Sequence, residues 1–204
     1  MPRVSEEHLE RRRQQIIDAA QRCFSRKGFY NTSMQDVFAE SGLSAGAVYR
    51  YFKSKDELVA ALASNATVDL RALMADVVRR DPLPTPAQVI DHMLTWFLPQ
   101  TGPEGRLRLA PQAWSLALVD PDAAVYVRRA MLGIREMWTE YIERTIEAGW
   151  LPEGTDKEAT ATALFGLLPG FLLQQLIIGD FDRKTAVRGM ESLFPFGATT
   201  PSRA

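Results

Sequence analysis

Hydrophobic residues in this chain recur at the three- and four-residue spacings of amphipathic α-helices, in segments separated by glycine, proline and capping residues. The first segment covers residues 5–27, and its apolar positions are Ile16, Ile17, Ala20, Cys23 and Phe24. It ends at Gly28 after two basic residues, a combination typical of a helix C-terminus. No segment carries strand signals. The pattern therefore predicts an all-α protein.

Two short helices are predicted next, joined by a turn that contains glycine. We expect Thr32 to cap the first helix, with Gln35 reaching back to the cap, and Gly42 to end it. Ser44 should cap the second helix, which covers about residues 45–52. This arrangement is a helix-turn-helix, in which the second helix enters the major groove of DNA.

A third helix start follows at Ser54, where Glu57 should close a capping box. Lys55 is electrostatically misplaced in that first turn, because the helix dipole favours negative charge there. We therefore interpret Lys55 as a ligand for something outside the helix, such as a phosphate. The apolar stripe continues to Val77, so one long helix should lead into the rest of the chain.

The remaining segments extend the helical pattern. Helices are expected to begin after a Thr85 cap with Pro86 and Gln88, at Pro111, after Asp120, after a capping box of Thr155 and Glu158, and at Asp182. Gly149 should close the helix that starts after Asp120.

Residues 161–178 are apolar on every face of the predicted helix, which therefore needs cover all round. A central core helix and a membrane span are two interpretations, and Pro169 should kink the helix in either case. We favour a third, in which one face packs inside the subunit and the other packs against a twofold copy. The interface residues expected here and on the following helix are Leu164, Leu167, Leu168, Phe171, Gln175, Ala186, Met190 and Leu193.

Charge is distributed unevenly along the chain. Residues 1–55 contain 10 Lys and Arg against 6 Asp and Glu, a balance of +4, while the remainder has −5 and the whole chain −1. The basic end coincides with the helix-turn-helix, as phosphate binding requires. The run Arg11, Arg12 and Arg13 could instead be only a solvated helix start.

The composition indicates a reducing compartment and a real hydrophobic core. Hydrophobic residues make up 46% of 204 positions, and the single cysteine, Cys23, is expected to be a small buried hydrophobe. The first thirteen residues are polar and charged, unlike a signal peptide, and no uninterrupted run of 18 apolar residues is present. We expect a soluble, cytoplasmic protein without a membrane partner.

The segment GFYNTSMQDVFAESGLSAGAVYRYFKSKDEL, from Gly28 to Leu58, resembles the DNA-binding segment of the TetR family of bacterial transcriptional repressors. The resemblance covers about residues 12–60, and only Phe38 falls where that family usually has alanine. It implies a helix-turn-helix domain, here residues 1–54, and a helical ligand-binding and dimerisation domain, residues 55–204.

Base reading by the second helix should be sparse. Arg50 can make a bidentate contact to guanine, whereas Ala45, Gly46 and Ala47, which follow the Ser44 cap, allow close approach and methyl contacts to thymine. The resemblance implies that phosphates are held by Tyr49, Tyr51 and Lys55, with Thr32 and Ser33 at the preceding helix start. Simple packing is the alternative for both tyrosines.

The resemblance also implies a homodimer joined through its last two helices, a double-stranded DNA operator, and a small effector bound in the C-terminal region. Apolar candidates for the effector site are Met93, Trp96, Phe97, Trp114, Met131, Trp138 and Phe165. Ordinary core packing is the alternative for each of them.

Enzyme chemistry finds little support. The chain has two histidines, no cluster at metal-ligand spacing and no phosphate-cradling glycine loop, so no cofactor or metal is expected. Two other function classes remain open. One is a helix-turn-helix protein used for architecture or protein contacts, and the other is an all-helical ligand carrier or enzyme.

Overall fold

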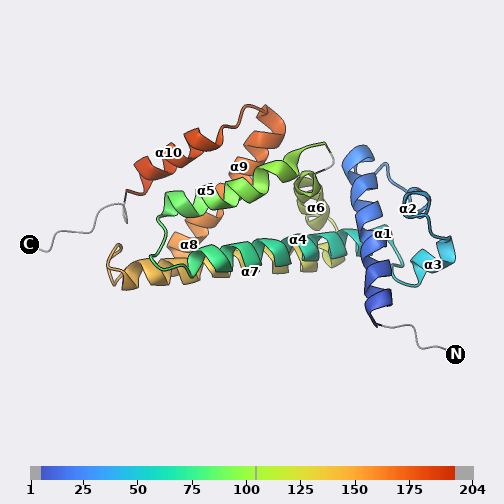
Figure 1. Ribbon diagram of the computed structural model, residues 1–204, viewed down its shortest axis with the longest axis horizontal. Coiled ribbons are helices and arrows are strands. Elements are labelled where there is room, and N and C mark those ends of the chain that lie inside the picture. The colour runs from blue at the N-terminus through green and yellow to red at the C-terminus, as the bar shows by residue number, and fades with distance from the viewer. Residues whose placement is uncertain (1–5, 104, 196–204) are drawn as a thin grey trace, which may run out of the picture. The chain divides into compact units, whose positions relative to one another are not determined.

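The structure is a computed structural model that describes residues 6–103 and 105–195. Its regular elements are all helical, and no strand occurs within these residues, which confirms the all-α prediction (Figure 1). The α-helices are α1 (Glu6–Lys27), α2 (Met34–Ser41), α3 (Ala45–Tyr49), α4 (Lys55–Val78), α5 (Pro86–Phe97), α6 (Ala110–Ala117), α7 (Pro121–Glu147), α8 (Lys157–Phe165), α9 (Leu167–Leu173) and α10 (Arg183–Leu193). Two 3₁₀ turns, η1 (Leu98–Thr101) and η2 (Arg106–Leu109), and a π-helical turn, η3 (Gln174–Ile178), complete the set.

The chain divides into two compact units. The first combines residues 1–66 with residues 102–128, and the second combines residues 67–101 with residues 129–204. The division falls inside α4 and α7, so each of these helices belongs partly to both units. The boundary that we placed between residues 54 and 55 stays a prediction.

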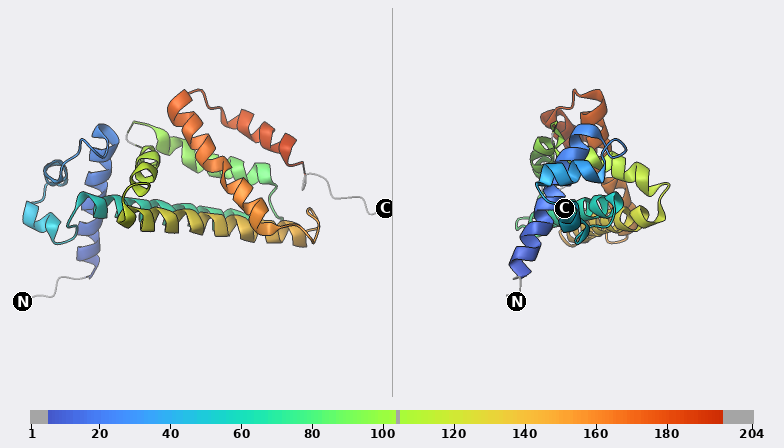
Figure 2. Two further views of the ribbon diagram at one scale, coloured as in Figure 1. Left: turned by 180° about the vertical axis from the view of Figure 1, so that it is seen from behind. Right: turned by 90° about the vertical axis from the view of Figure 1, so that its right-hand side faces the viewer.

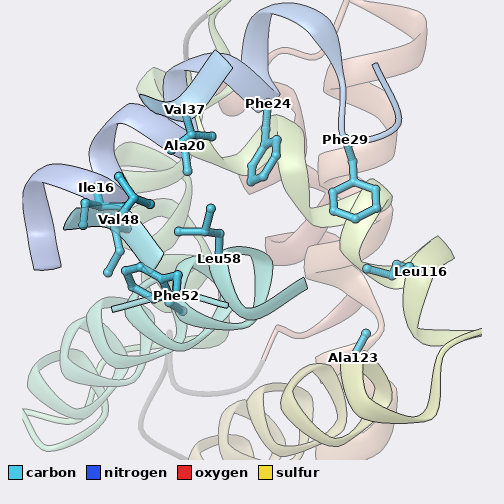
Figure 3. Close-up of a cluster of buried hydrophobic side chains, with 12 residues drawn as sticks. Ile16, Ala20, Phe24, Phe29, Val37, Val48, Phe52, Leu58, Leu116 and Ala123 are labelled. Atoms are coloured by element: carbon cyan, nitrogen blue, oxygen red, sulfur yellow. The ribbon is translucent and has the colours of Figure 1, made fainter. Parts of the chain in front are cut away.

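One hydrophobic core holds the first unit together (Figure 3). Ile16, Ala20 and Phe24 of α1 pack with Val37 of α2 and Val48 of α3, all of them at most 1% exposed. Leu116 of α6 and Ala123 of α7 belong to the same cluster, although they lie far along the chain. The core thus includes residues outside the segment that carries the helix-turn-helix.

In the second unit α10 packs along α5 (Figure 2). Arg183 at the start of α10 forms an ion pair with Asp91 of α5, with an N–O distance of 3.1 Å. The buried Tyr141 of α7 donates a hydrogen bond to the carbonyl oxygen of Pro84 at 2.7 Å, and burial raises the pKa of its phenol. The hydroxyl of the buried Tyr141 is in this way tied to a backbone oxygen.

Two of the predicted caps are wrong by one residue. The capping residue of α2 is Ser33, whose hydroxyl accepts from the N–H of Asp36, while the Asp36 carboxylate accepts from the N–H of Ser33. The cap of α8 is Asp156 rather than Thr155. The predicted caps at Ser44 and Thr85 and the helix ends at Gly28, Gly42 and Gly149, all three with positive φ, are confirmed. The helix predicted to begin at Asp182 begins at Arg183, and Asp182 is its cap.

The apolar run is not one smooth helix. It consists of α8, α9 and η3, and α8 ends at Gly166, three residues before Pro169. Proline has no N–H to donate to the carbonyl four residues earlier, which explains an interruption in this turn. By length and mean hydropathy alone, Lys157–Ile178 is long and apolar enough to cross a membrane, although it contains polar residues that interrupt the apolar run. In this structure 22% of its most apolar 18-residue window is buried. One such helix is weak evidence for a membrane span.

Part of the predicted dimer surface faces the inside of its own subunit. Leu164, Leu168 and Met190 are only 1%, 7% and 2% exposed, because they pack within the second unit. The large apolar side chains that remain exposed in this region are Leu173, Ile177, Ile178 and Leu193. Three of these four were missing from our prediction, because a helix that is apolar all round does not reveal which face turns outward.

Candidate nucleic-acid interface

The helix-turn-helix is built as its local sequence dictates. Gly42 adopts φ +67° and its N–H bonds back to α2 carbonyls, which ends that helix. The Ser44 hydroxyl then accepts from the N–H of Ala47 at 3.3 Å and starts α3. Because Val37 and Val48 are both fully buried in the shared core, one face of each helix is anchored inward.

The opposite face of α3 presents few chemical groups. Ala45, Gly46 and Arg50 are exposed, and Ala47 is half-buried. The guanidinium of Arg50 has no ion-pair or hydrogen-bond partner among the described residues. This face therefore offers one bidentate donor without a partner in the described part of the chain, beside residues with small side chains.

Both predicted tyrosines also pack against protein. Tyr49 is 41% exposed, and its ring meets the ring of Phe38 edge to face, with 5.3 Å between centroids. Phe38 of α2, the one residue that departs from the family pattern, thus packs against α3 through Tyr49. Tyr51 is half-buried against the core cluster.

Thr32 is placed differently from its predicted role. Its side chain is 2% exposed, and its hydroxyl donates to the carbonyl oxygen of Gly28 at 2.8 Å. A phosphate contact from this hydroxyl is disfavoured by that burial. Ser33 beside it is exposed, but its hydroxyl donates to the carboxylate of Asp36 at 2.8 Å.

Lys55 has a role inside the protein that its sequence position does not reveal. Its ammonium group donates to the carbonyl oxygen of Phe29 at 2.8 Å and lies 4.3 Å from the centroid of the Phe29 ring. An ammonium carries three donors, so a phosphate contact is compatible with this position.

Ion pairs hold α2 against α1. Arg22 and Arg26 both donate to the carboxylate of Glu40, and Lys27 donates to Asp36 at 2.6 Å. These bonds keep the pKa values of both carboxyls below their usual range: Lys27 and then Ser33 act on Asp36, and Arg22 and then Arg26 act on Glu40.

The arginine run near the N-terminus is engaged rather than free. Arg11 pairs with Glu7, Arg12 donates to Gln15 at 2.9 Å, and Arg13 lies 5.4 Å from the centroid of the Phe52 ring. These local contacts agree with the interpretation of the run as a helix start.

The predicted effector residues do not form one site within either unit. Trp114 belongs to the first unit and the other six residues belong to the second. Met93, Phe97 and Trp138 are buried, whereas Trp96, Met131 and Phe165 are half-buried. The indole N–H of Trp138 is fully buried and has no hydrogen-bond partner among the described residues.

A groove of about 870 Å³ in the second unit contains none of the predicted effector residues. It is lined by Asp81, Pro82, Leu83, Thr85, Ala87, Gln88, Arg144, Glu147, Ala148, Trp150, Glu191, Phe194 and Pro195. No periodic or motif signal in the sequence brings these positions together. Among the described residues, no group of His, Cys, Asp and Glu could hold a metal ion.

Sequence reasoning also missed Gln112 of α6. Its side-chain oxygen accepts from the backbone N–H of Phe29 at 2.7 Å, across 83 positions of sequence. This contact could not be predicted from the sequence, because the pattern of an amphipathic helix does not indicate which distant residue a polar side chain will contact.

Comparison with known proteins agrees with this geometry. The sequence profile described as "Bacterial regulatory proteins, tetR family" matches residues 16–62, and that described as "BetI-type transcriptional repressor, C-terminal" matches residues 86–193. The chain is 33% identical over 193 residues to the HTH-type transcriptional repressor AcnR of Corynebacterium diphtheriae, an alignment that covers 89% of this chain and 90% of that protein.

Two further relatives extend the comparison. The HTH-type transcriptional repressor Rv1474c of Mycobacterium tuberculosis is 39% identical over 92 residues, which span 43% of this chain and about half (49%) of that repressor. The crystal structure of the transcriptional regulator FadR from Bacillus subtilis, in complex with stearoyl-CoA, shares the fold with a TM-score of 0.73 at 16% identity. It covers 88% of this chain and 96% of that one. With profile matches on both segments and a full-length relative, the chain belongs to the TetR family of bacterial regulatory proteins.

Proposed function

We propose that this protein is a ligand-responsive repressor that binds a near-palindromic operator as a homodimer. The observation that carries the DNA-binding part is the guanidinium of Arg50, which is unpaired among the described residues and directly follows α3, the second helix of an anchored helix-turn-helix. An exposed cation without an internal partner on this helix is placed to contact a base edge or a phosphate.

The roles divide by chemistry. Arg50 reads guanine, Ala45, Gly46 and Ala47 allow the backbone to come close, and the exposed hydroxyl of Tyr49 holds a phosphate. Lys55 and Tyr51 can add contacts beyond their internal ones. With about 6–10 neutralised phosphates per complex, affinity should fall by roughly 10³–10⁵ between 50 and 200 mM salt.

A subunit that makes only one strong base contact has too little sequence specificity to select a site alone, so a second copy is needed. We place the contact between copies on the exposed apolar side chains of η3 and α10, which are Ile177, Ile178 and Leu193, with Leu173 on α9. Leu167, Phe171, Gln175 and Ala186 are half-buried and can border this surface. Association of two copies would remove this apolar patch from water, which is favourable. Soluble proteins rarely leave a large apolar patch exposed unless it is an interaction site.

The proposed effector is a small, largely apolar molecule that binds in the second unit. Trp138 supports this site, because a buried indole N–H without a partner can donate to an oxygen of a bound ligand. The related FadR structure holds stearoyl-CoA, which is an apolar chain with a polar end. A ligand that prefers the DNA-incompetent state lowers operator affinity only by the ratio of its affinities for the two states.

A mobility-shift assay with the DNA that flanks the protein's own gene tests this function. Specific binding that a small molecule releases supports the proposal. Binding without sequence preference would instead favour an architectural role, and no binding would favour a helical carrier or enzyme. We expect the protein to act in the cytoplasm, where its operator is.

A further inference from the structure

The backbone of Phe29 is held from two sides by side chains from different parts of the chain. Its N–H donates to the side-chain oxygen of Gln112 at 2.7 Å, and its carbonyl oxygen accepts from the ammonium of Lys55 at 2.8 Å. The Phe29 ring is 7% exposed, packs in the core of the first unit and lies under the same ammonium. We call this set of contacts the Phe29 clamp.

The clamp sits at the corner between α1 and α2. Gly28 turns the chain with φ +77°, and the corner is closed by the Thr32 hydroxyl, which donates to the Gly28 carbonyl oxygen. The next residue, Ser33, caps α2. Because α2 and α3 pack in the same core, the conformation of this corner affects the position of α3 as well as that of α2.

Gln112 reaches the corner from α6. It lies in the segment that matches the C-terminal profile, outside residues 16–62, yet it belongs to the compact unit that contains the helix-turn-helix. Leu116 on the same helix is part of the same core, so α6 is fixed against the corner by packing as well as by a hydrogen bond. The side-chain nitrogen of Gln112 donates to the carbonyl oxygen of Arg108, which orients the acceptor oxygen.

We propose that Gln112 is a positioning residue for DNA binding. By accepting a hydrogen bond from the Phe29 N–H, it fixes the corner between α1 and α2 and thereby the position of α2 and α3. This inference rests on the proposed function. Gln112 is not one of the residues that we propose to contact DNA, so its loss should change affinity without changing the number of phosphates neutralised.

Two variants separate the acceptor from the bulk of the side chain. Gln112→Glu keeps an oxygen that can accept from the Phe29 N–H, whereas Gln112→Met has similar length and no such acceptor. We expect Gln112→Met to bind the DNA flanking its own gene about tenfold more weakly, as the loss of one hydrogen bond implies, and Gln112→Glu to bind within about twofold of the unaltered chain.

Two readouts distinguish positioning from general destabilisation. In hydrogen exchange, the amide of Phe29 should exchange faster in Gln112→Met than in Gln112→Glu, while the amides in the middle of α1 stay protected. The slope of log affinity against log salt should stay equal in both variants. Should Gln112→Met fail to fold, Gln112→Asn, whose acceptor is one methylene shorter, replaces it with the same expectation.

The inference is overturned if Gln112→Met binds as tightly as the unaltered chain, if both variants lose affinity equally, or if the salt slope falls. In these cases specific binding by the unaltered chain keeps the proposed function intact. If the unaltered chain itself shows no specific binding, the proposed function fails, and the positioning role fails with it.

Discussion

At the residue scale, Tyr49 at the end of α3 and Arg50 directly after it have different proposed tasks. Arg50→Ala should remove discrimination at one base pair, worth roughly 1–3 kcal/mol, because it deletes the bidentate donor. Tyr49→Phe keeps the ring against Phe38 and removes only a hydroxyl, so it should weaken binding to operator and scrambled DNA alike. Fluorescence anisotropy on both DNAs checks this, and equal behaviour of the two variants would contradict the division of roles.

Acid should loosen the contact between α1 and α2 through Asp36. The bonds from Lys27 and Ser33 lower the pKa of Asp36, so their stabilisation is fully present above the ordinary carboxyl pKa of about 4. It is lost progressively as pH falls from that value toward the lowered pKa, because the carboxyl of the unfolded chain is protonated first. Melting temperatures measured from pH 6 to pH 3 should therefore fall less steeply for Asp36→Asn than for the unaltered chain. Glu40 keeps its lowered pKa in both proteins, so it contributes the same slope to each. Parallel curves would show that Asp36 contributes nothing to the acid sensitivity.

At the element scale, the start of α8 depends on Asp156, whose carboxylate accepts from the N–H of Ala159 at 3.0 Å. Asp156→Ala should lower the free energy of unfolding by about 1 kcal/mol, which is typical for the loss of an N-cap. Thr155→Ala, at the residue that the sequence suggested as the cap, is the matched control and should have little effect. Urea titration of both variants decides between the two positions.

Local chemistry explains which features of the elements could be predicted. The caps at Ser44 and Thr85 and the stop at Gly42 depend on a few consecutive residues, so the sequence is sufficient to place them. The cap of α2 was misplaced because Thr32 and Ser33 are adjacent hydroxyl residues. What distinguishes them is the bond of Thr32 to Gly28, which requires the folded corner.

Contacts over long sequence distances could not be predicted. Helical periodicity identifies a buried face but not the partner that buries it, so Gln112 and the groove beside Trp150 carried no signal. The same limit applies to the candidate site. The donors of Arg50 and the charge and family position of Lys55 indicated both residues, whereas the bond of Lys55 to Phe29 depends on three-dimensional packing.

At the scale of the whole molecule, the compact units do not follow chain order. The first unit takes residues 102–128 from the segment that the second sequence profile matches, so α6 and the first part of α7 belong with the helix-turn-helix. The chain changes unit inside the helices α4 and α7 rather than in loops. The chain therefore passes from one unit to the other through helical backbone in both places.

In the proposed function, site selection depends on the pairing of two copies. Ile177 is 75% exposed on η3, and in the proposed dimer it is covered by the partner. Ile177→Glu should therefore shift sedimentation at micromolar concentration from dimer to monomer, because association would bury an unpaired charge. Val68→Glu, at an apolar residue of α4 that is 63% exposed, is the matched control and should remain dimeric.

Loss of the dimer in Ile177→Glu should also change its relative affinity for a full operator and a single half-site. A dimer reads two half-sites about 34–36 Å apart, so its affinity for the full operator gains from both, whereas a monomer gains from one. Ile177→Glu should lose most of the preference for a full operator over a single half-site, yet keep the half-site affinity, because η3 and α3 belong to different units. Anisotropy titrations on the two DNAs measure this ratio. A monomeric variant that still preferred the full operator would place the pairing of the reading helices elsewhere.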